Sequence, residues 1–133
     1  MKNRYVVSLD KLTSRPVPGL PTVKLSYALR PETVGCKNFS VNHVVYPVGQ
    51  GSAVHAHQEE GWVILQGSGW LKVGDKKYPF KARDLLYVPA DVPHQVVNTG
   101  DGPLELLAIT APPIDFEKDL KVIEPFDPAR HLA

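Results

Sequence analysis

The chain lacks the features that mark secreted, membrane-spanning or nucleic-acid-binding proteins. It has 133 residues, one cysteine, one methionine and a net charge of only +1. The single cysteine, Cys36, excludes an internal disulfide framework and is typical of a reducing compartment. A charge near zero gives no attraction to nucleic acid or to an anionic membrane surface. The first residues contain no apolar run long enough for a signal peptide or a membrane helix, so we expect a cytoplasmic protein.

Long helices are also not expected, because 13 prolines and 10 glycines interrupt the chain. Between these breaks lie short apolar or alternating segments, and Gly74-Asp75 is a two-residue hairpin signal. The predicted strands cover residues 22–29, 39–48, 52–57, 62–66, 70–73, 76–80, 84–88, 94–98 and 104–110. Many short strands with closely spaced turns indicate an all-β sandwich or barrel, and 43% hydrophobic residues are enough for one domain with a real core.

The stretch from Gly49 to Trp62 holds the main candidate site. His55 and His57 are two residues apart, so an extended strand directs both imidazoles to the same face. Two carboxylates, Glu59 and Glu60, follow almost at once. Neutral imidazole is the commonest protein ligand for first-row transition metals, and a carboxylate adds negative charge. The pattern therefore indicates a metal site.

A third histidine, His94, belongs to a second segment, and the two segments together resemble the motifs of the cupin superfamily. The first motif reads G, five residues, HxH, three or four residues, E, six residues, G; the matching residues are Gly49, His55, His57, Glu60 and Gly67. The second reads G, five residues, PxG, two residues, H, three residues, N; the matching residues are Pro89, His94 and Asn98. Only residues 68–82 separate the motifs, as in the small microbial members.

The resemblance covers roughly residues 38–111 and identifies the chain as similar to a small single-domain cupin with a conserved barrel. It implies an all-β fold, a double-stranded β-helix or jelly-roll barrel. We expect one domain over residues 1–133, with an N-terminal arm (1–37), a core barrel (about 38–111) and a C-terminal tail (112–133). The resemblance also implies a homodimer, for which the proline-rich arm offers a means.

The chain departs from the family pattern at three points. Only Gln58 and Glu59 stand between His57 and Glu60, one residue fewer than usual. Arg83 and Asp91 replace the two glycines of the second motif, which affects turn geometry, although aspartate tolerates a positive φ better than most residues. The short gap leaves two candidates for the carboxylate ligand. Glu60 has the family's spacing to Gly67, whereas strand alternation from His57 places Glu59 on the ligand face.

The expected ligand set is His55, His57, His94 and Glu60, holding one divalent transition metal ion: Fe, Mn, Ni, Co or Zn. Four protein ligands leave two positions of an octahedral ion open, and Glu60 is also the expected catalytic residue because it could move a proton. We expect a metal-dependent enzyme, of dioxygenase type, that acts on a small organic substrate. A non-catalytic binding or sensor protein, or an isomerase, decarboxylase or lyase, are the alternatives. Metal affinity is expected to fall as pH drops, because protons compete for the imidazoles.

Two further histidines are not expected to be ligands. His43 shares a strand face with Val41 and Val45, which is typical of a core or interface histidine, although it could line the pocket. His131 lies in the expected tail and is predicted to be solvated. The aromatic residues are predicted to be core or rim residues, some of which shape an apolar pocket: Phe39, Tyr46, Trp62, Trp70 and Tyr87.

Overall fold

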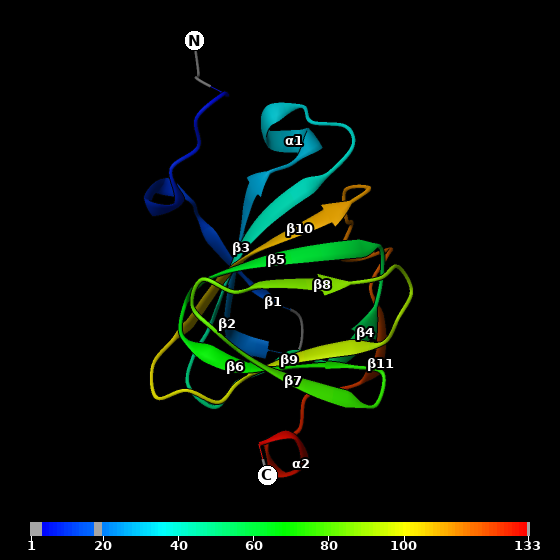
Figure 1. The fold of residues 1–133 in the computed structure, drawn as a ribbon. Coiled ribbons are helices and arrows are strands. Elements are labelled where there is room, and N and C mark those ends of the chain that lie inside the picture. Colours follow the sequence, from blue (N-terminus) through cyan, green and yellow to red (C-terminus); the bar gives the residue numbers. More distant parts are fainter. Residues whose placement is uncertain (1–3, 18–19, 133) are drawn as a thin grey trace.

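The computed structural model describes residues 4–17 and 20–132, so residues 1–3 and 18–19 of the expected arm and residue 133 of the tail lie outside it. Within these ranges the chain forms two antiparallel sheets that face each other (Figure 1). The first sheet runs in the order β1 (Ser14–Val17), β2 (Leu20–Leu29), β3 (Ser40–Tyr46), β10 (Leu104–Ala111), β5 (Glu59–Gln66) and β8 (Leu85–Val88). The second runs in the order β11 (Lys121–Glu124), β4 (Val54–Ala56), β9 (His94–Asn98), β6 (Ser68–Val73) and β7 (Lys76–Lys81).

The helices are short: α1 spans Pro31–Val34, α2 spans Pro128–His131, and a 3₁₀ turn covers Leu9–Lys11. In the part of the chain that the structure describes, no helix is both long enough and apolar enough to cross a membrane. The predicted all-β jelly-roll fold is therefore confirmed. Strands distant in the sequence lie side by side, as where β10 pairs with both β3 and β5.

The core lies between the sheets because successive side chains of a strand point to opposite faces. Along β3 the residues Ser40, Asn42 and Val44 are buried, while their neighbours Val41 and His43 are partly exposed. The buried apolar cluster comes from the inner faces of both sheets, and its members are Val23, Leu25, Val44, Trp62, Ile64, Leu71, Phe80, Val88, Val96, Leu104, Leu106 and Ala108.

The sheets extend beyond the expected core of residues 38–111 at both ends. The expected arm supplies β1 and β2, and β2 pairs with β3 over the register from Lys24–Val45 to Leu29–Val41. The expected tail supplies β11, which pairs with β4, the strand that carries His55. The segment between β10 and β11 therefore crosses the end of the barrel where the candidate metal ligands lie.

Arg83 and Asp91 adopt the backbone conformation that the family's glycines would adopt. Their φ angles are 78° and 64°, in the left-handed region that favours glycine. The Asp91 turn also positions the site, because its backbone N–H donates to the His57 carbonyl oxygen over 2.8 Å. The two departures from the motif thus keep the turn geometry, at some cost in backbone strain at Arg83.

Replacing Arg83 with glycine is expected to raise the free energy of unfolding by about 0.5–1 kcal/mol. The left-handed conformation costs a non-glycine residue about 1–2 kcal/mol, and part of the relief is offset by the greater freedom of glycine in the unfolded chain. Urea denaturation of the two proteins measures the difference. Ala82→Gly is the matched control: φ is not positive at Ala82, so glycine there should lower the stability instead.

Candidate metal centre

The three motif histidines converge at one end of the barrel. His55 lies on β4 and pairs in register with His94, the first residue of β9, while His57 follows the end of β4. Ligand atoms of the three side chains all lie within 4.8 Å of one another, and all three residues are buried. The structure therefore brings together residues that are up to 39 positions apart in the sequence, as the two motifs predict.

Backbone carbonyls hold the three imidazole rings in one tautomer. The Nδ1 atom of His55 lies 2.6 Å from the Ala53 oxygen, and that of His94 lies 2.9 Å from the Val92 oxygen. His57 makes the equivalent contact with the Gln58 oxygen, also over 2.9 Å. A carbonyl can only accept, so each Nδ1 carries the proton and each Nε2 keeps its lone pair. This is the arrangement in which outer hydrogen bonds orient metal-binding histidines.

The carboxylate that faces the histidines belongs to Glu60. Its oxygens lie 3.2 Å from the Nε2 atom of His57 and 3.9 Å from that of His94. Glu60 is 6% exposed and comes from β5, so it reaches the histidines from the opposite sheet. The Nε2 atom of His94 is buried and has no hydrogen-bond partner among the described residues. A metal ion is a group that would satisfy it.

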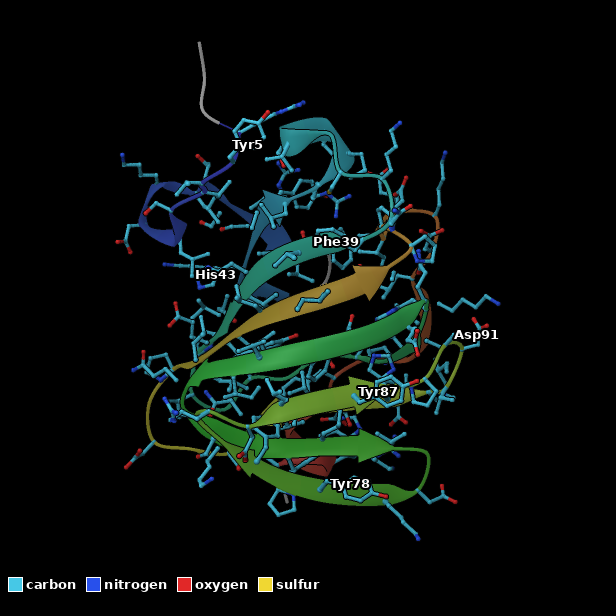
Figure 2. The ribbon with its side chains drawn as sticks, turned by 45° about the horizontal axis from the view of Figure 1, so that its top comes forward. Tyr5, Phe39, His43, Tyr78, Tyr87 and Asp91 are labelled. Atoms are coloured by element: carbon cyan, nitrogen blue, oxygen red, sulfur yellow. The ribbon has the colours of Figure 1, made fainter. Side chains whose placement is uncertain are left out.

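Glu59 does not face the histidines. The chain leaves the second sheet after Ala56 and enters the first at Glu59, so strand alternation is interrupted at His57 and Gln58. Glu59 therefore points outward, where its carboxylate accepts a hydrogen bond from the exposed hydroxyl of Tyr87, a residue on the outer surface of β8 (Figure 2). The alternation that made Glu59 a candidate does not continue across this change of sheet.

Burial controls the charge state of these four groups. It lowers the pKa of His55 to about 3 and that of His94 to about 4, and it also lowers the pKa of His57. It raises the pKa of Glu60 to about 8. Without a cation the site therefore consists of neutral imidazoles and a carboxyl group that holds its proton at pH 7. This set offers three neutral nitrogen donors and one carboxyl group, and a cation would favour ionisation of that group. Such a donor set fits a divalent transition metal.

A cavity of about 110 Å³ adjoins the site and is called the central cavity below. His55, His57 and Glu60 line one part of it, and most of the other wall residues are apolar. Tyr46 and Trp62, predicted as core or rim aromatics, both line it. Its volume has room for on the order of ten water-sized groups, which corresponds to a small organic molecule.

Several residues that line this cavity are not among the candidates predicted from the sequence. Phe116, Leu120 and Val122 come from the expected tail, and Asn42 and Thr110 come from the inner faces of β3 and β10. The inward alternation of β3 was visible in the sequence and marked Asn42 as a polar residue beside Val44. No pattern in the sequence indicated that the segment after Pro113 folds back over the barrel.

The other two histidines lie away from the central cavity. His43 is on the outer face of the first sheet, labelled in Figure 2, where its Nε2 atom lies 2.6 Å from a Glu105 oxygen. The interpretation of His43 as a satisfied structural residue is confirmed. The prediction for His131 is wrong: it is only 9% exposed, and its Nδ1 accepts a hydrogen bond from the Asp127 N–H over 2.9 Å. Its ring also stacks on Phe126, because the last residues pack as α2 instead of extending into solvent.

Two facing sheets with three buried histidines and one carboxylate at one end define a β-barrel whose donor set fits a divalent metal ion. Residues 42–110, just over half of the chain, match the family described as the Cupin domain, and the chain belongs to this family. The predicted resemblance is thereby confirmed.

Known proteins resemble the chain at several levels of identity. An uncharacterised protein of Methanocaldococcus jannaschii is 33% identical over 87 residues, which are 64% of this chain and 69% of that protein. The structure of a predicted oxalate decarboxylase from Thermotoga maritima has a TM-score of 0.70 at 23% identity, and covers 89% of this chain and 99% of its own. Oxalate decarboxylase of Bacillus subtilis, a protein with Mn(II) centres, has a TM-score of 0.63 at 25% identity and covers 67% of this chain and 26% of its own.

Proposed function

We propose that the chain binds one divalent transition metal ion through His55, His57, His94 and Glu60 and acts as a metal-dependent enzyme of dioxygenase type on a small organic substrate. The convergence of three oriented Nε2 lone pairs on one buried carboxylate, beside a cavity, carries the proposal. The Mn(II) centres of the B. subtilis protein, which has the same fold, support a divalent metal. Among the candidate ions, iron or manganese suits chemistry with O2 because both change oxidation state.

The chain's own residues would each contribute to such a reaction. A divalent ion held by His55, His57, His94 and Glu60 would supply a Lewis acid for a substrate oxygen or for O2. The largely apolar walls of the central cavity exclude water and hold the carbon skeleton of the substrate. Glu60, when it is not bound to the ion, is placed to hold or release a proton beside the substrate, because it also lines the cavity.

Elemental analysis of untagged protein purified without chelators tests the first half of the proposal, with about one metal ion per chain as the expected result. Oxygen uptake with iron-loaded and manganese-loaded protein, over a panel of small oxygen-bearing organic compounds, tests the second half. The control is protein stripped with a chelator, which should consume no O2. Release of CO2 under nitrogen would replace dioxygenase by decarboxylase chemistry, and absence of any metal after reconstitution would contradict the proposal as a whole.

The pH dependence of metal affinity should come mainly from Glu60 and not from His55 or His94. His55 and His94, with pKa values of about 3 and 4, are already neutral at pH 5, so protons do not compete for them between pH 5 and 8. Glu60, with a pKa of about 8, must lose a proton to bind an ion below that pH. Affinity should therefore fall about tenfold for each unit below pH 8, since one proton is released per ion.

Chelator competition between pH 5.5 and 8.5 measures this slope. In Glu60→Gln the group that titrates is gone, so the residual affinity should be nearly constant over the same range. A slope that survives in Glu60→Gln would show that the histidines compete with protons after all. This result would restore the expectation drawn from the sequence, in which proton binding to the imidazoles weakens metal binding.

A further inference from the structure

The central cavity contains a polar group that the proposed metal centre does not use. The Nδ2 atom of Asn42 is buried and has no hydrogen-bond partner among the described residues. The Trp62 side chain, by contrast, interacts with Glu60 and stabilises its ionised form. An amide nitrogen is a hydrogen-bond donor. A cavity with largely apolar walls and a buried, unpaired donor favours a ligand that carries an acceptor oxygen.

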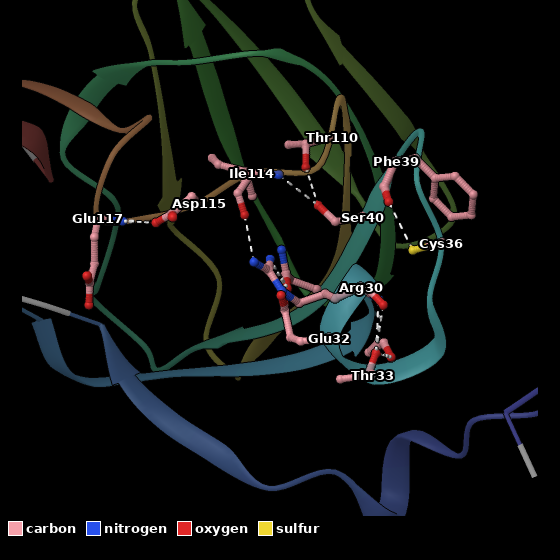
Figure 3. Close-up of polar contacts among 12 residues, drawn as sticks. Arg30, Glu32, Thr33, Cys36, Phe39, Ser40, Thr110, Ile114, Asp115 and Glu117 are labelled. Atoms are coloured by element: carbon pink, nitrogen blue, oxygen red, sulfur yellow. Dashed lines mark hydrogen bonds and ion pairs between the residues drawn. The ribbon is translucent and has the colours of Figure 1, made fainter.

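The orientation of the Asn42 amide is fixed by Arg30. Figure 3 shows contacts of Arg30 with Glu32 and Ile114. Arg30 is 5% exposed, and its Nη1 atom donates to the Asn42 Oδ1 oxygen over 3.4 Å. A guanidinium group has donors only, so the amide oxygen must face Arg30. The amide nitrogen is then the atom that remains for a ligand. Asn42 itself is fully buried, so its amide cannot turn to bulk water instead.

Arg30 is held firmly enough to act as a fixed support. Its Nη2 atom donates to the Ile114 carbonyl oxygen over 2.7 Å, and its Nε atom donates to the Glu32 carboxylate. The guanidinium also lies over the Tyr27 ring, 4.0 Å from the ring centre. These contacts come from three separate segments of the chain. They leave the arginine, and therefore the amide in front of it, little freedom to rotate.

The charge of Arg30 makes the Asn42 N–H₂ group a better donor. The Glu32 side chain is 54% exposed, so water screens its negative charge, whereas the Arg30 charge is buried beside the cavity wall. A buried cation on the oxygen side of an amide polarises it and strengthens hydrogen bonds from the nitrogen side. The arrangement therefore favours a negatively charged acceptor over a neutral one and disfavours an ammonium group.

We propose that Asn42 determines the substrate class, by donating its amide N–H₂ group to a carboxylate at the end of the ligand remote from the histidines. This inference rests on the proposed function, since it takes the other end of the ligand to lie at the metal. Asn42 and Glu60 stand on β3 and β5, which flank β10 and so lie about 10 Å apart at the usual strand spacing, and both side chains line the cavity. The ligand class is thus a short organic acid with oxygen atoms at both ends.

The test measures selectivity on metal-loaded protein. Isothermal titration calorimetry compares straight-chain dicarboxylates of two to six carbons with ω-hydroxy and ω-amino acids of equal length, so that each probe keeps one carboxylate for the metal and varies only the far end. The wild-type protein should bind one or more dicarboxylates at least about tenfold more tightly than the matching ω-amino acid, as expected for a hydrogen bond to a charged group in a buried site.

Three variants separate the role of Asn42 from its effect on folding. Asn42→Leu keeps the branched shape and the number of side-chain heavy atoms, and should remove the preference. Asn42→Asp keeps an acceptor for Arg30, so the support stays intact, but it turns a negative charge toward the cavity and should shift the preference to the ω-amino acid. Val44→Ala changes the same cavity wall on the same strand and should retain the wild-type preference.

Metal content, measured on the same samples, distinguishes failure of the inference about Asn42 from failure of the proposed function. Loss of the preference in Asn42→Leu with one metal ion per chain retained supports the inference. A metal-loaded wild-type protein that binds no dicarboxylate better than its amino analogue would overturn the role of Asn42 alone. So would equal selectivity in the wild type, Asn42→Leu and Asn42→Asp. A wild-type protein without metal would overturn the proposed function.

Discussion

Replacing His57 with alanine is expected to leave the purified protein without stoichiometric transition metal. His57 supplies one of the three Nε2 lone pairs, and the remaining ligands would bind an ion through one contact fewer, with a hole beside Glu60. Loss of a hydrogen-bond partner that only orients a metal ligand typically lowers metal affinity by about 10–100-fold. Loss of the ligand itself should therefore lower metal affinity by about 100-fold or more. Elemental analysis of the variant and the wild type, prepared side by side, measures the effect.

His43→Ala is the matched control for that experiment. It also removes one partly buried imidazole, but His43 is on the outer face of the first sheet and contacts Glu105 instead of the site. It should keep the wild-type metal content. Circular dichroism of both variants shows whether they fold. Stoichiometric metal in a folded His57→Ala protein would exclude His57 as a ligand.

Glu60→Gln should have the second large effect, while Glu59→Gln should have almost none. Glutamine keeps the shape of Glu60 but cannot carry the negative charge that would face the ion, so metal affinity at pH 8 should fall by about 10–100-fold or more. Glu59 is exposed and contacts Tyr87, so its loss removes one surface hydrogen bond. Chelator competition on the two variants gives the comparison.

The metal-free proteins provide an independent check on Glu60. Its raised pKa means that the folded chain keeps the proton up to about pH 8, whereas the unfolded chain loses it near the ordinary value of 4.5. Wild-type stability therefore falls relative to Glu60→Gln as pH rises from about 4.5 to 8, and the difference stays constant at higher pH. Equal pH profiles for the two apo proteins, or metal loss in Glu59→Gln instead, would reassign the carboxylate.

Spacing alone predicted much of this site because strand periodicity is local. The two-residue repeat of a strand predicted that His55 and His57 lie together. The family motif predicted that His94 joins them. Periodicity could not decide whether Glu60 or Glu59 faces the histidines, since the repeat ends where the chain passes from β4 to β5. In the structure Glu60 is buried and faces His57 and His94, whereas Glu59 is exposed and contacts Tyr87.

The parts that the sequence did not predict depend on long-range contacts. Lys121–Glu124 was expected to belong to a tail, but it pairs with β4 because that strand otherwise forms the edge of the second sheet. Phe116 and Leu120, which precede this strand, and Val122 within it line the cavity. Arg30 lies outside the strands predicted from the sequence. Its contacts with Asn42 and Ile114 join it to positions 12 and 84 residues away.

The change of sheet between β4 and β5 has a consequence for how the protein matures. Histidine donors stand on the second sheet and the carboxylate donor on the first, so the full set exists only when the two sheets have closed on each other. A partly folded chain can offer a pair of histidines but holds an ion more weakly. Under the proposed function, metal loading is linked to completion of the fold, and tight retention of the ion would distinguish fully folded molecules from partly folded ones.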